Sequence, residues 1–336
     1  MRMIRGIFGL LLGMLLILGI MFVTLIVRED RNRETVSKVS TAKYHLQILV
    51  QNTDEYFWQY FKDGARTAAE EMDVYAEFVP IAGKDSEAIK DAVEKGIYSG
   101  VNGIALKPAD ALGTKEIAKE AKEKNIPLLI YENDSYNISD LPIVGSNSYT
   151  IGTMAGTMGA KAIGRGTKAV IIMNEAGEEG DISYRNLSIQ GIAESFSLKG
   201  NIEIEEIYTL KQNMFDAEKV TYSIISKHKD VNLIICLDEK STPGVAQVLV
   251  DNNLVGDIKL VGYGSMPLTL DYVERGVIYG TVSPDAYKIG YYTVKQLAQE
   301  LNGVQISDYK STPLYSIDAS NVASFNNGAA KKEGGE

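Results

Sequence analysis

The feature of this sequence that most constrains its fold is a regular alternation of short apolar runs with longer amphipathic stretches, which begins at Tyr44. The apolar runs are HLQILV, YAEFVPI, GIALK, PLLIY, PIVGS, KAVIIM, IEIEEIYTL, VNLIIC, KLVGY and IYGTVS. Stretches with helical periodicity separate most of them. Continuous apolar strands that alternate with helices are typical of parallel sheets covered on both faces. These strands are too many for one compact sheet of this kind, so we predict an α/β fold with two doubly wound, Rossmann-like lobes.

An uncharged run precedes this alternation and predicts a membrane anchor. Gly6–Val27 has no charged residue, and about 20 apolar residues are enough for a helix to cross a bilayer. Arg2 and Arg5 precede the run, which favours an extracytoplasmic position for the large domain. The run is longer than the core of a signal peptide, and the nearest small-residue site, Ser40–Ala42, lies well past its end. We expect a retained single-pass transmembrane helix at the cell membrane rather than a cleaved signal.

Composition and motifs exclude several classes of function. The net charge of −10 argues against nucleic-acid binding, which needs a basic face. The single cysteine, Cys236, lies in the apolar run VNLIIC, so we interpret it as a buried hydrophobe. His45 and His228 are far apart in the sequence, and no Walker A, GxSxG or HExxH motif is present. We therefore predict no enzyme, cofactor or metal site. GTMAGTMG, at Gly152–Gly159, has glycines at helical spacing and indicates a helix packed closely on a sheet.

Ligands of doubly wound folds bind beyond the carboxyl ends of the strands, so the residues that follow each strand are the candidates. These segments are rich in carboxylates, amides, hydroxyls and aromatic rings. Carboxylates accept hydrogen bonds from sugar hydroxyls, and aromatic rings cover the apolar faces of a sugar. The candidates therefore suit a neutral polyol better than an anion.

Several of these residues have a purely structural alternative. Phe57 and Trp58, where the first strand gives way to a helix, either plug the core or face a ligand. We favour ligand stacking for both and assign the core role to Phe61. Asp238 either caps the next helix or binds the ligand. Lys107 is the cationic exception among the candidates.

The motifs at these strand ends give the chain its resemblance to a known family. They are QNTDEYFWQYFKDGA, ALKPAD, NIPLLIYEND, SNSYTIGTMAG, CLDEKSTPGVAQVL and KLVGYGSMP. With them, the chain resembles the type I periplasmic sugar-binding proteins of the ribose-, xylose- and galactose-binding group, from about Tyr44 to Phe325. The resemblance implies two lobes that are joined by three hinge strands and close on one small ligand.

The resemblance also implies roles for individual residues. Phe57 and Trp58 match the aromatic pair that sandwiches the sugar, and Glu132 matches an aspartate at the end of the fourth strand. Arg185 or Asn186 lies near an arginine expected in the second lobe. The candidate ligand-binding residues are Glu55, Phe57, Trp58, Lys107, Glu132, Asn133, Asp134, Asn147, Arg185, Asn186, Asp238 and Tyr263.

Together with the hydropathy and the polar segments, the resemblance divides the chain into an anchor, a tether, two lobes and a tail. The anchor is 1–27, the tether 28–43, the first lobe 44–146 with 285–308, the second lobe 147–284 with 309–328, and the disordered tail 329–336. Ribose-binding relatives have polar residues near Leu237 and Gly264 and an amide in place of Lys107. These departures favour a sugar other than ribose.

These observations predict an extracytoplasmic, membrane-tethered receptor for a monosaccharide, with a pentose such as xylose favoured. The retained N-terminal helix resembles the membrane-anchored sugar-binding co-sensors of clostridia, which pair with a sensor histidine kinase. Lobe closure on the sugar would then be the signal that the kinase reads. The alternative partner is an ABC permease, for which the protein would deliver the sugar.

Overall fold

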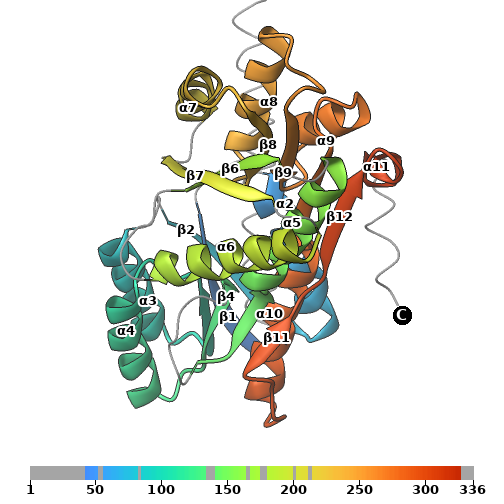
Figure 1. Cartoon of the computed structure of the whole chain (residues 1–336). Helices are drawn as coiled ribbons and strands as arrows, with labels where there is room; N and C mark the ends of the chain where they lie inside the picture. Colours follow the sequence, from blue (N-terminus) through green and yellow to red (C-terminus); the bar gives the residue numbers. More distant parts are fainter. Residues whose placement is uncertain are drawn as a thin grey trace, which may run out of the picture.

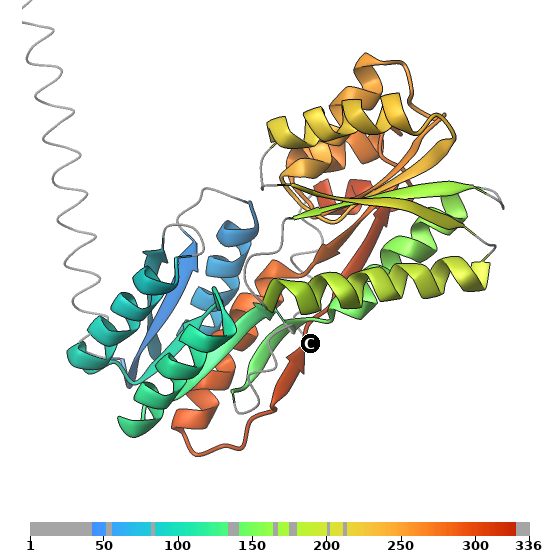
Figure 2. The ribbon, with the colours of Figure 1, turned by 60° about the vertical axis from the view of Figure 1, so that its left-hand side comes forward.

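The computed structural model describes residues 42–51, 56–81, 85–133, 141–163, 167–174, 180–199, 202–210 and 214–326. They form two α/β lobes joined by extended segments (Figures 1 and 2), which confirms the predicted fold class. The predicted anchor and tail lie outside these ranges, as do Glu55 and Asp134. Within the described ranges, no helix has both the length and the apolar character needed to span a membrane.

The first lobe is a six-stranded parallel sheet in the order β11-β5-β4-β3-β1-β2. Its strands are β1 (Tyr44–Gln51), β2 (Val74–Ile81), β3 (Gly103–Leu106), β4 (Leu128–Asn133), β5 (Ile143–Ser146) and β11 (Tyr309–Ser311). Its helices are α2 (Tyr56–Glu71), α3 (Ser86–Ser99), α4 (Ala111–Glu123) and α10 (Ala286–Leu301).

The second lobe is a six-stranded sheet in the order β12-β10-β9-β8-β6-β7, in which β12 runs antiparallel to β10. Its strands are β6 (Lys168–Asn174), β7 (Glu203–Leu210), β8 (Val231–Cys236), β9 (Lys259–Tyr263), β10 (Gly280–Pro284) and β12 (Leu314–Asp318). Its helices are α5 (Ser148–Ala162), α6 (Gly180–Lys199), α7 (Met214–Lys227), α8 (Ser241–Asp251), α9 (Pro267–Glu274) and α11 (Val322–Asn326).

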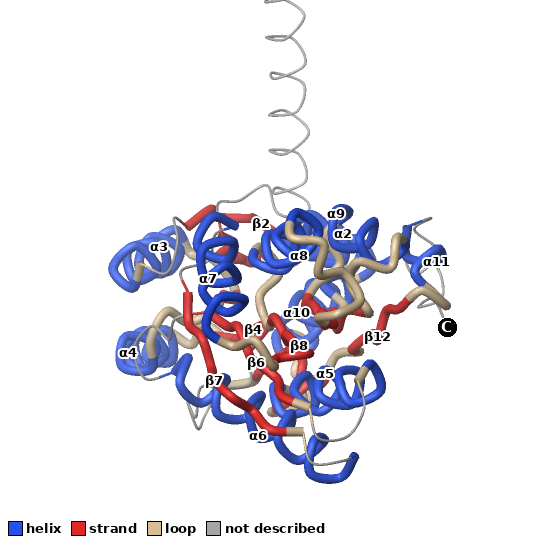
Figure 3. Tube along the Cα trace, turned by 45° about the horizontal axis from the view of Figure 1, so that its top comes forward, coloured by secondary structure: helices blue, strands red, loops and turns tan. Residues whose placement is uncertain are grey.

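Helices cover both faces of each sheet, which explains why the strands are apolar along their whole length (Figure 3). In β1, Leu46 and Ile48 pack with α2 and α10, whereas Leu49 packs with α3 and α4. In β6, Ile171 packs with α5 and α6, whereas Val170 packs with α7 and α8. Each central strand therefore buries successive side chains on opposite faces, and no polar face is left to interrupt the run.

Three connections cross between the lobes, and all of them join carboxyl edges. One leads from β5 into α5 at Asn147, and a second leads from β10 into α10 at Asp285. The third runs from β11 to β12, whose first residue, Leu314, pairs with Pro284 at the carboxyl end of β10. The carboxyl edges of the two sheets therefore lie at the boundary between the lobes, where ligands of such sheets bind.

β11 corrects one boundary of the predicted division. Residues 309–328 were assigned to the second lobe, but Tyr309–Ser311 pairs with β5 and extends the first sheet. The crossing instead follows Ser311. It is fastened by hydrogen bonds between Ser146 Oγ and Thr312 Oγ1, 3.0 Å apart, and from Asp285 N to the carbonyl oxygen of Pro313, 3.1 Å apart. The three crossing segments thus contact one another as well as both lobes.

In the first lobe, two glycines let α2 and α10 meet backbone to backbone. A Cβ added to Gly64 would lie 1.9 Å from the carbonyl oxygen of Tyr287. A Cβ added to Gly290 would lie 1.9 Å from the carbonyl oxygen of Phe61. Since any side chain would separate the helices, only glycine fits at these two positions.

The second lobe repeats this arrangement in α5 and α6. A Cβ at Gly152 would lie 2.0 Å from the carbonyl oxygen of Ser188, and one at Gly191 would lie 2.3 Å from that of Tyr149. Gly159, later in the same glycine-rich segment, packs against Leu233 of β8. The segment is therefore a helix, as predicted, but its first glycine faces another helix rather than the sheet. We call the four helix-to-helix contacts of Gly64, Gly290, Gly152 and Gly191 the paired glycine contacts.

Candidate functional site

The strand order locates one ligand-binding position in each sheet. In the first sheet, the connection after β1 leads to β2 on one side, whereas the connection after β3 leads to β4 on the other side. In the second sheet, the connections after β6 and β8 diverge in the same way, toward β7 and β9. Loops diverge at such a point and leave room beyond the strand ends. The residues after these four strands are therefore the first candidates.

In the first lobe, the segment after β3 serves mainly to begin α4. Asp110 caps the helix by accepting a hydrogen bond from Gly113 N at 2.6 Å and another from the Ser86 hydroxyl. These bonds stabilise the carboxylate, with the Ser86 hydroxyl contributing most, and lower the pKa of Asp110. Lys107 precedes this cap and is partly buried.

The structure favours the core alternative for Trp58. Its side chain is 2 % exposed and packs in the core of the first lobe. The indole lies 5.5 Å from the ring of Phe61 and 6.1 Å from that of Tyr131, measured between centroids. Core neighbours therefore surround most of the indole. Phe57 is only partly buried, so it is the better stacking candidate of the two.

Two further candidates of the first lobe lie where the sequence predicted. Glu132 and Asn133 are the last two residues of β4, so their backbone reaches the carboxyl edge. Asn147 lies in the first crossing and caps α5, accepting a hydrogen bond from Thr150 N at 2.9 Å. Its side-chain oxygen, Oδ1, is therefore used at least in part to cap that helix.

In the second lobe, Asp238 and Asn174 join the ends of β8 and β6. Asn174 Nδ2 donates to Asp238 Oδ2 at 2.9 Å, while Ser241 N donates to Asp238 Oδ1 at 2.8 Å. Asp238 is 5 % exposed and thus fulfils the capping alternative at the start of α8. Asn174 is not among the predicted ligand residues, although it directly follows the apolar run KAVIIM and the strand-end rule points to it.

The remaining predicted residues of the second lobe are spread over α6 and β9. Arg185 is partly buried, and among the described residues its buried Nε has no hydrogen-bond partner. Asn186, next to it, is exposed. Tyr263 ends β9 and packs against the core that underlies α5 and α6. Arg185 is therefore the predicted residue here that most clearly needs a further partner.

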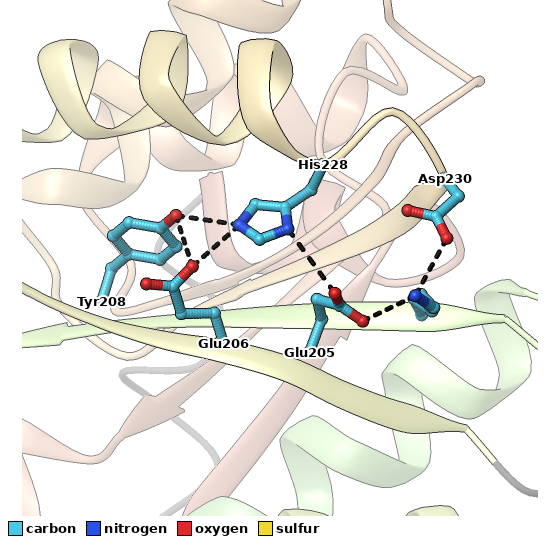
Figure 4. A network of polar contacts seen from close by, with 6 residues as sticks. Glu205, Glu206, Tyr208, His228 and Asp230 are labelled. Atoms are coloured by element: carbon cyan, nitrogen blue, oxygen red, sulfur yellow. Dashed lines mark hydrogen bonds and ion pairs between the residues drawn. The ribbon is translucent and has the colours of Figure 1, made fainter.

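A denser polar cluster lies at the opposite edge of the second sheet (Figure 4). Glu206 accepts from Tyr208 and from His228 Nε2, both at 2.8 Å, and Lys168 Nζ contacts Glu205 and Asp230 at 2.8 and 3.0 Å. Lys168 is the first residue of β6, and Asp230 directly precedes β8. The cluster therefore lies at the amino ends of the strands, where it ties the edge strand β7 to its neighbours.

The described residues offer little for catalysis. Burial raises the pKa of Cys236 to about 12, so its thiol stays protonated. No group of His, Cys, Asp and Glu within the described ranges could hold a metal ion. What the carboxyl edges do offer is hydrogen-bonding groups and a partly exposed ring, which suits binding.

Two doubly wound lobes, joined by three crossings with their carboxyl edges at the boundary, define a bilobed binding protein. Residues 46–305 match the model of the periplasmic binding protein domain family. The chain belongs to this family, as the sequence motifs predicted.

Curated and solved relatives agree with this classification. The chain is 21% identical to the D-allose-binding periplasmic protein of Escherichia coli over 296 residues, which covers 84% of this chain and 92% of that protein. The solved periplasmic ribose ABC transporter protein from Conexibacter woesei has a TM-score of 0.77 and 22% identity, covering 87% of this chain and 97% of that one. GanP, a glucose-galactose binding protein from Geobacillus stearothermophilus, has a TM-score of 0.74 and 24% identity, covering 83% and 98%.

Proposed function

We propose that this protein is an extracytoplasmic, membrane-tethered receptor that binds a neutral monosaccharide between its two lobes. The observation that carries the proposal is the position of both carboxyl edges at the lobe boundary, reached by three crossings. Arg185 supports it, because its buried donor needs an acceptor that a sugar oxygen can supply. The relatives named above bind or transport allose, ribose, glucose and galactose, which supports a sugar as the ligand class.

A pentose such as xylose is the favoured ligand. Closure of the lobes on this sugar would create the shape that a membrane partner reads. We place the protein at the membrane through Gly6–Val27 and favour a sensor histidine kinase as the partner. An ABC permease is the alternative partner, supported by the relative from Conexibacter woesei.

A ligand screen tests the binding proposal directly. Full-length protein in detergent would be heated with D-xylose, D-ribose, D-allose or D-galactose, and hits would be measured by calorimetry. A sugar at 100 times its Kd stabilises the native state by about 2.7 kcal/mol, so the unfolding temperature should rise with concentration. If no monosaccharide raises it, the proposal fails.

A genetic experiment separates the two partners. With a confirmed sugar, deletion of the kinase gene should abolish sugar-induced transcription and leave uptake intact. Loss of uptake on deletion of a permease gene, with transcription unchanged, would support the alternative.

A further inference from the structure

We infer that Asn174 is a specificity-determining residue whose side-chain oxygen accepts a hydrogen bond from a hydroxyl of the ligand, and that Asp238 holds it in position. This inference rests on the proposed function. It starts from the last residue of β6, beside the point in the second sheet where the strand order reverses. Ile172, two residues earlier, pairs with Cys236 of β8, so Asn174 and Asp238 lie beyond neighbouring strand ends.

The two oxygens of Asp238 are engaged on different sides. Oδ1 accepts from the amide and the hydroxyl of Ser241, which begins α8. Oδ2 accepts from Asn174 Nδ2 at 2.9 Å. Asp238 is thereby fixed by the helix that it caps and is 5 % exposed. A carboxylate held in this way provides a rigid acceptor for Asn174.

This acceptor determines which way the Asn174 amide faces. A carboxylate only accepts hydrogen bonds, so the NH₂ group of Asn174 must point to it. The amide oxygen must then point away from Asp238. That oxygen is buried and has no hydrogen-bond partner among the described residues. A buried acceptor left in this state costs free energy, so a donor from a bound molecule would stabilise it.

The chemistry of this oxygen defines the group that can satisfy it. Only a donor will do, so a carboxylate or phosphate oxygen of a ligand is excluded. Arg185, on the helix that follows β6, has the opposite need, because its buried Nε requires an acceptor. A hydroxyl both donates and accepts, so a polyhydroxylated neutral ligand can satisfy both residues. Asn174 thus narrows the ligand to one with a hydroxyl directed at the end of β6.

The test compares variants on the sugar that stabilises wild-type protein best in the panel of D-xylose, D-ribose, D-allose and D-galactose. Asn174→Ala should weaken binding of this sugar roughly tenfold to a hundredfold by calorimetry. One monodeoxy analogue of the sugar should bind wild-type protein more weakly than the sugar does, by a similar factor. The same analogue should bind Asn174→Ala as tightly as the sugar itself binds that variant. This coupling identifies the hydroxyl that Asn174 contacts.

Asp238→Asn tests the positioning role. Asparagine caps a helix as well as aspartate does, so α8 and the unfolding temperature should change little. The Ser241 amide keeps the oxygen of the introduced asparagine on its own side, so the NH₂ group of that asparagine would face Asn174 and reverse the orientation of the Asn174 amide, and affinity should fall. Asn252→Ala is the control, because it removes a side-chain amide bonded to the carbonyl oxygen of Val248 at 2.8 Å at the far end of α8. It should leave affinity unchanged.

The outcomes separate this inference from the proposed function. If a sugar binds wild-type protein and binds folded Asn174→Ala equally well, the inference about Asn174 is wrong and the receptor proposal stands. If Asn174→Ala does not fold, the monodeoxy series with Asp238→Asn decides the question. If Asp238→Asn no longer distinguishes the sugar from the monodeoxy analogue, the inference is supported. If it distinguishes them as well as wild-type protein does, the inference is overturned. If no monosaccharide binds wild-type protein, both fail.

Discussion

The paired glycine contacts predict a large effect from one added methyl group. In Gly290→Ala, the new Cβ would lie 1.9 Å from the carbonyl oxygen of Phe61, whereas ordinary contact begins at 3.4 Å. The helices α2 and α10 must therefore separate by about 1.5 Å, the difference between these distances. The carbonyl oxygen belongs to one helix backbone and the position of Cβ is fixed by the other, so no side-chain rotation can relieve the clash.

The magnitude follows from two opposing effects. Overpacking of a core costs roughly 1–3 kcal/mol, and a backbone clash lies at the upper end of that range. Alanine gains up to about 1 kcal/mol over glycine in a helix interior. We therefore expect a net loss of about 2 kcal/mol, which lowers the unfolding temperature by roughly 4–8 °C for a lobe of this size.

The assay is thermal unfolding followed by circular dichroism. Gly113→Ala is the matched control, because its Cβ would meet only the side-chain carboxylate of Asp110, at 3.0 Å and beyond, and no backbone atom. This variant should stay close to the wild-type temperature. An unchanged or higher unfolding temperature for Gly290→Ala would refute the argument, because it would show that the two backbones are not held in contact.

Three other perturbations give distinct outcomes. Trp58→Ala should destabilise the protein by about 3–5 kcal/mol in a denaturant titration, because it leaves a cavity in the core. Phe57→Ala should weaken sugar binding with little loss of stability. The reverse pattern would identify Trp58 as the stacking ring. A hydrogen bond from Tyr208 lowers the pKa of Glu206 below its ordinary value of 4.5, and one from Lys168 lowers that of Asp230 below 3.8. The two ionised carboxylates therefore stabilise the fold above these values. This stabilisation is lost as the pH falls through the folded-state pKa. The unfolding temperature of wild-type protein should therefore drop between about pH 5 and 3, and that of Glu206→Gln should drop less; parallel curves would contradict this origin. Full-length protein should remain with the membrane fraction at full mass, and a mature N-terminus near residue 43 would contradict the anchor.

Much of the fold could be predicted because it depends on patterns along the chain. Buried parallel strands must be apolar on both faces, so each central strand appears as a short apolar run. β11 could not be found this way, because its three residues, YKS, carry no apolar pattern and pair only through contact with β5. Its place in the first sheet depends on a long-range pairing with β5, which a local sequence pattern does not indicate.

The site was harder to predict, and Trp58 shows why. An aromatic residue at the start of a helix after a strand end suits either a core or a ligand. The deciding signal was helical spacing: Trp58, Phe61, Ala65 and Ala68 lie on one buried face of α2. Asn174 illustrates the opposite difficulty, because its importance depends on a partner, Asp238, 64 residues away.

The paired glycine contacts also bear on how such a chain arose. Tyr149 and Gly152 in α5 have the same spacing and the same contacts as Tyr287 and Gly290 in α10. Each of these helices follows the last parallel strand before a crossing and then packs on the other lobe. Two copies of a single half-length chain that exchanged their final helices would show this arrangement. The bilobed chain thus has the internal symmetry of a domain-swapped dimer whose two subunits were fused end to end.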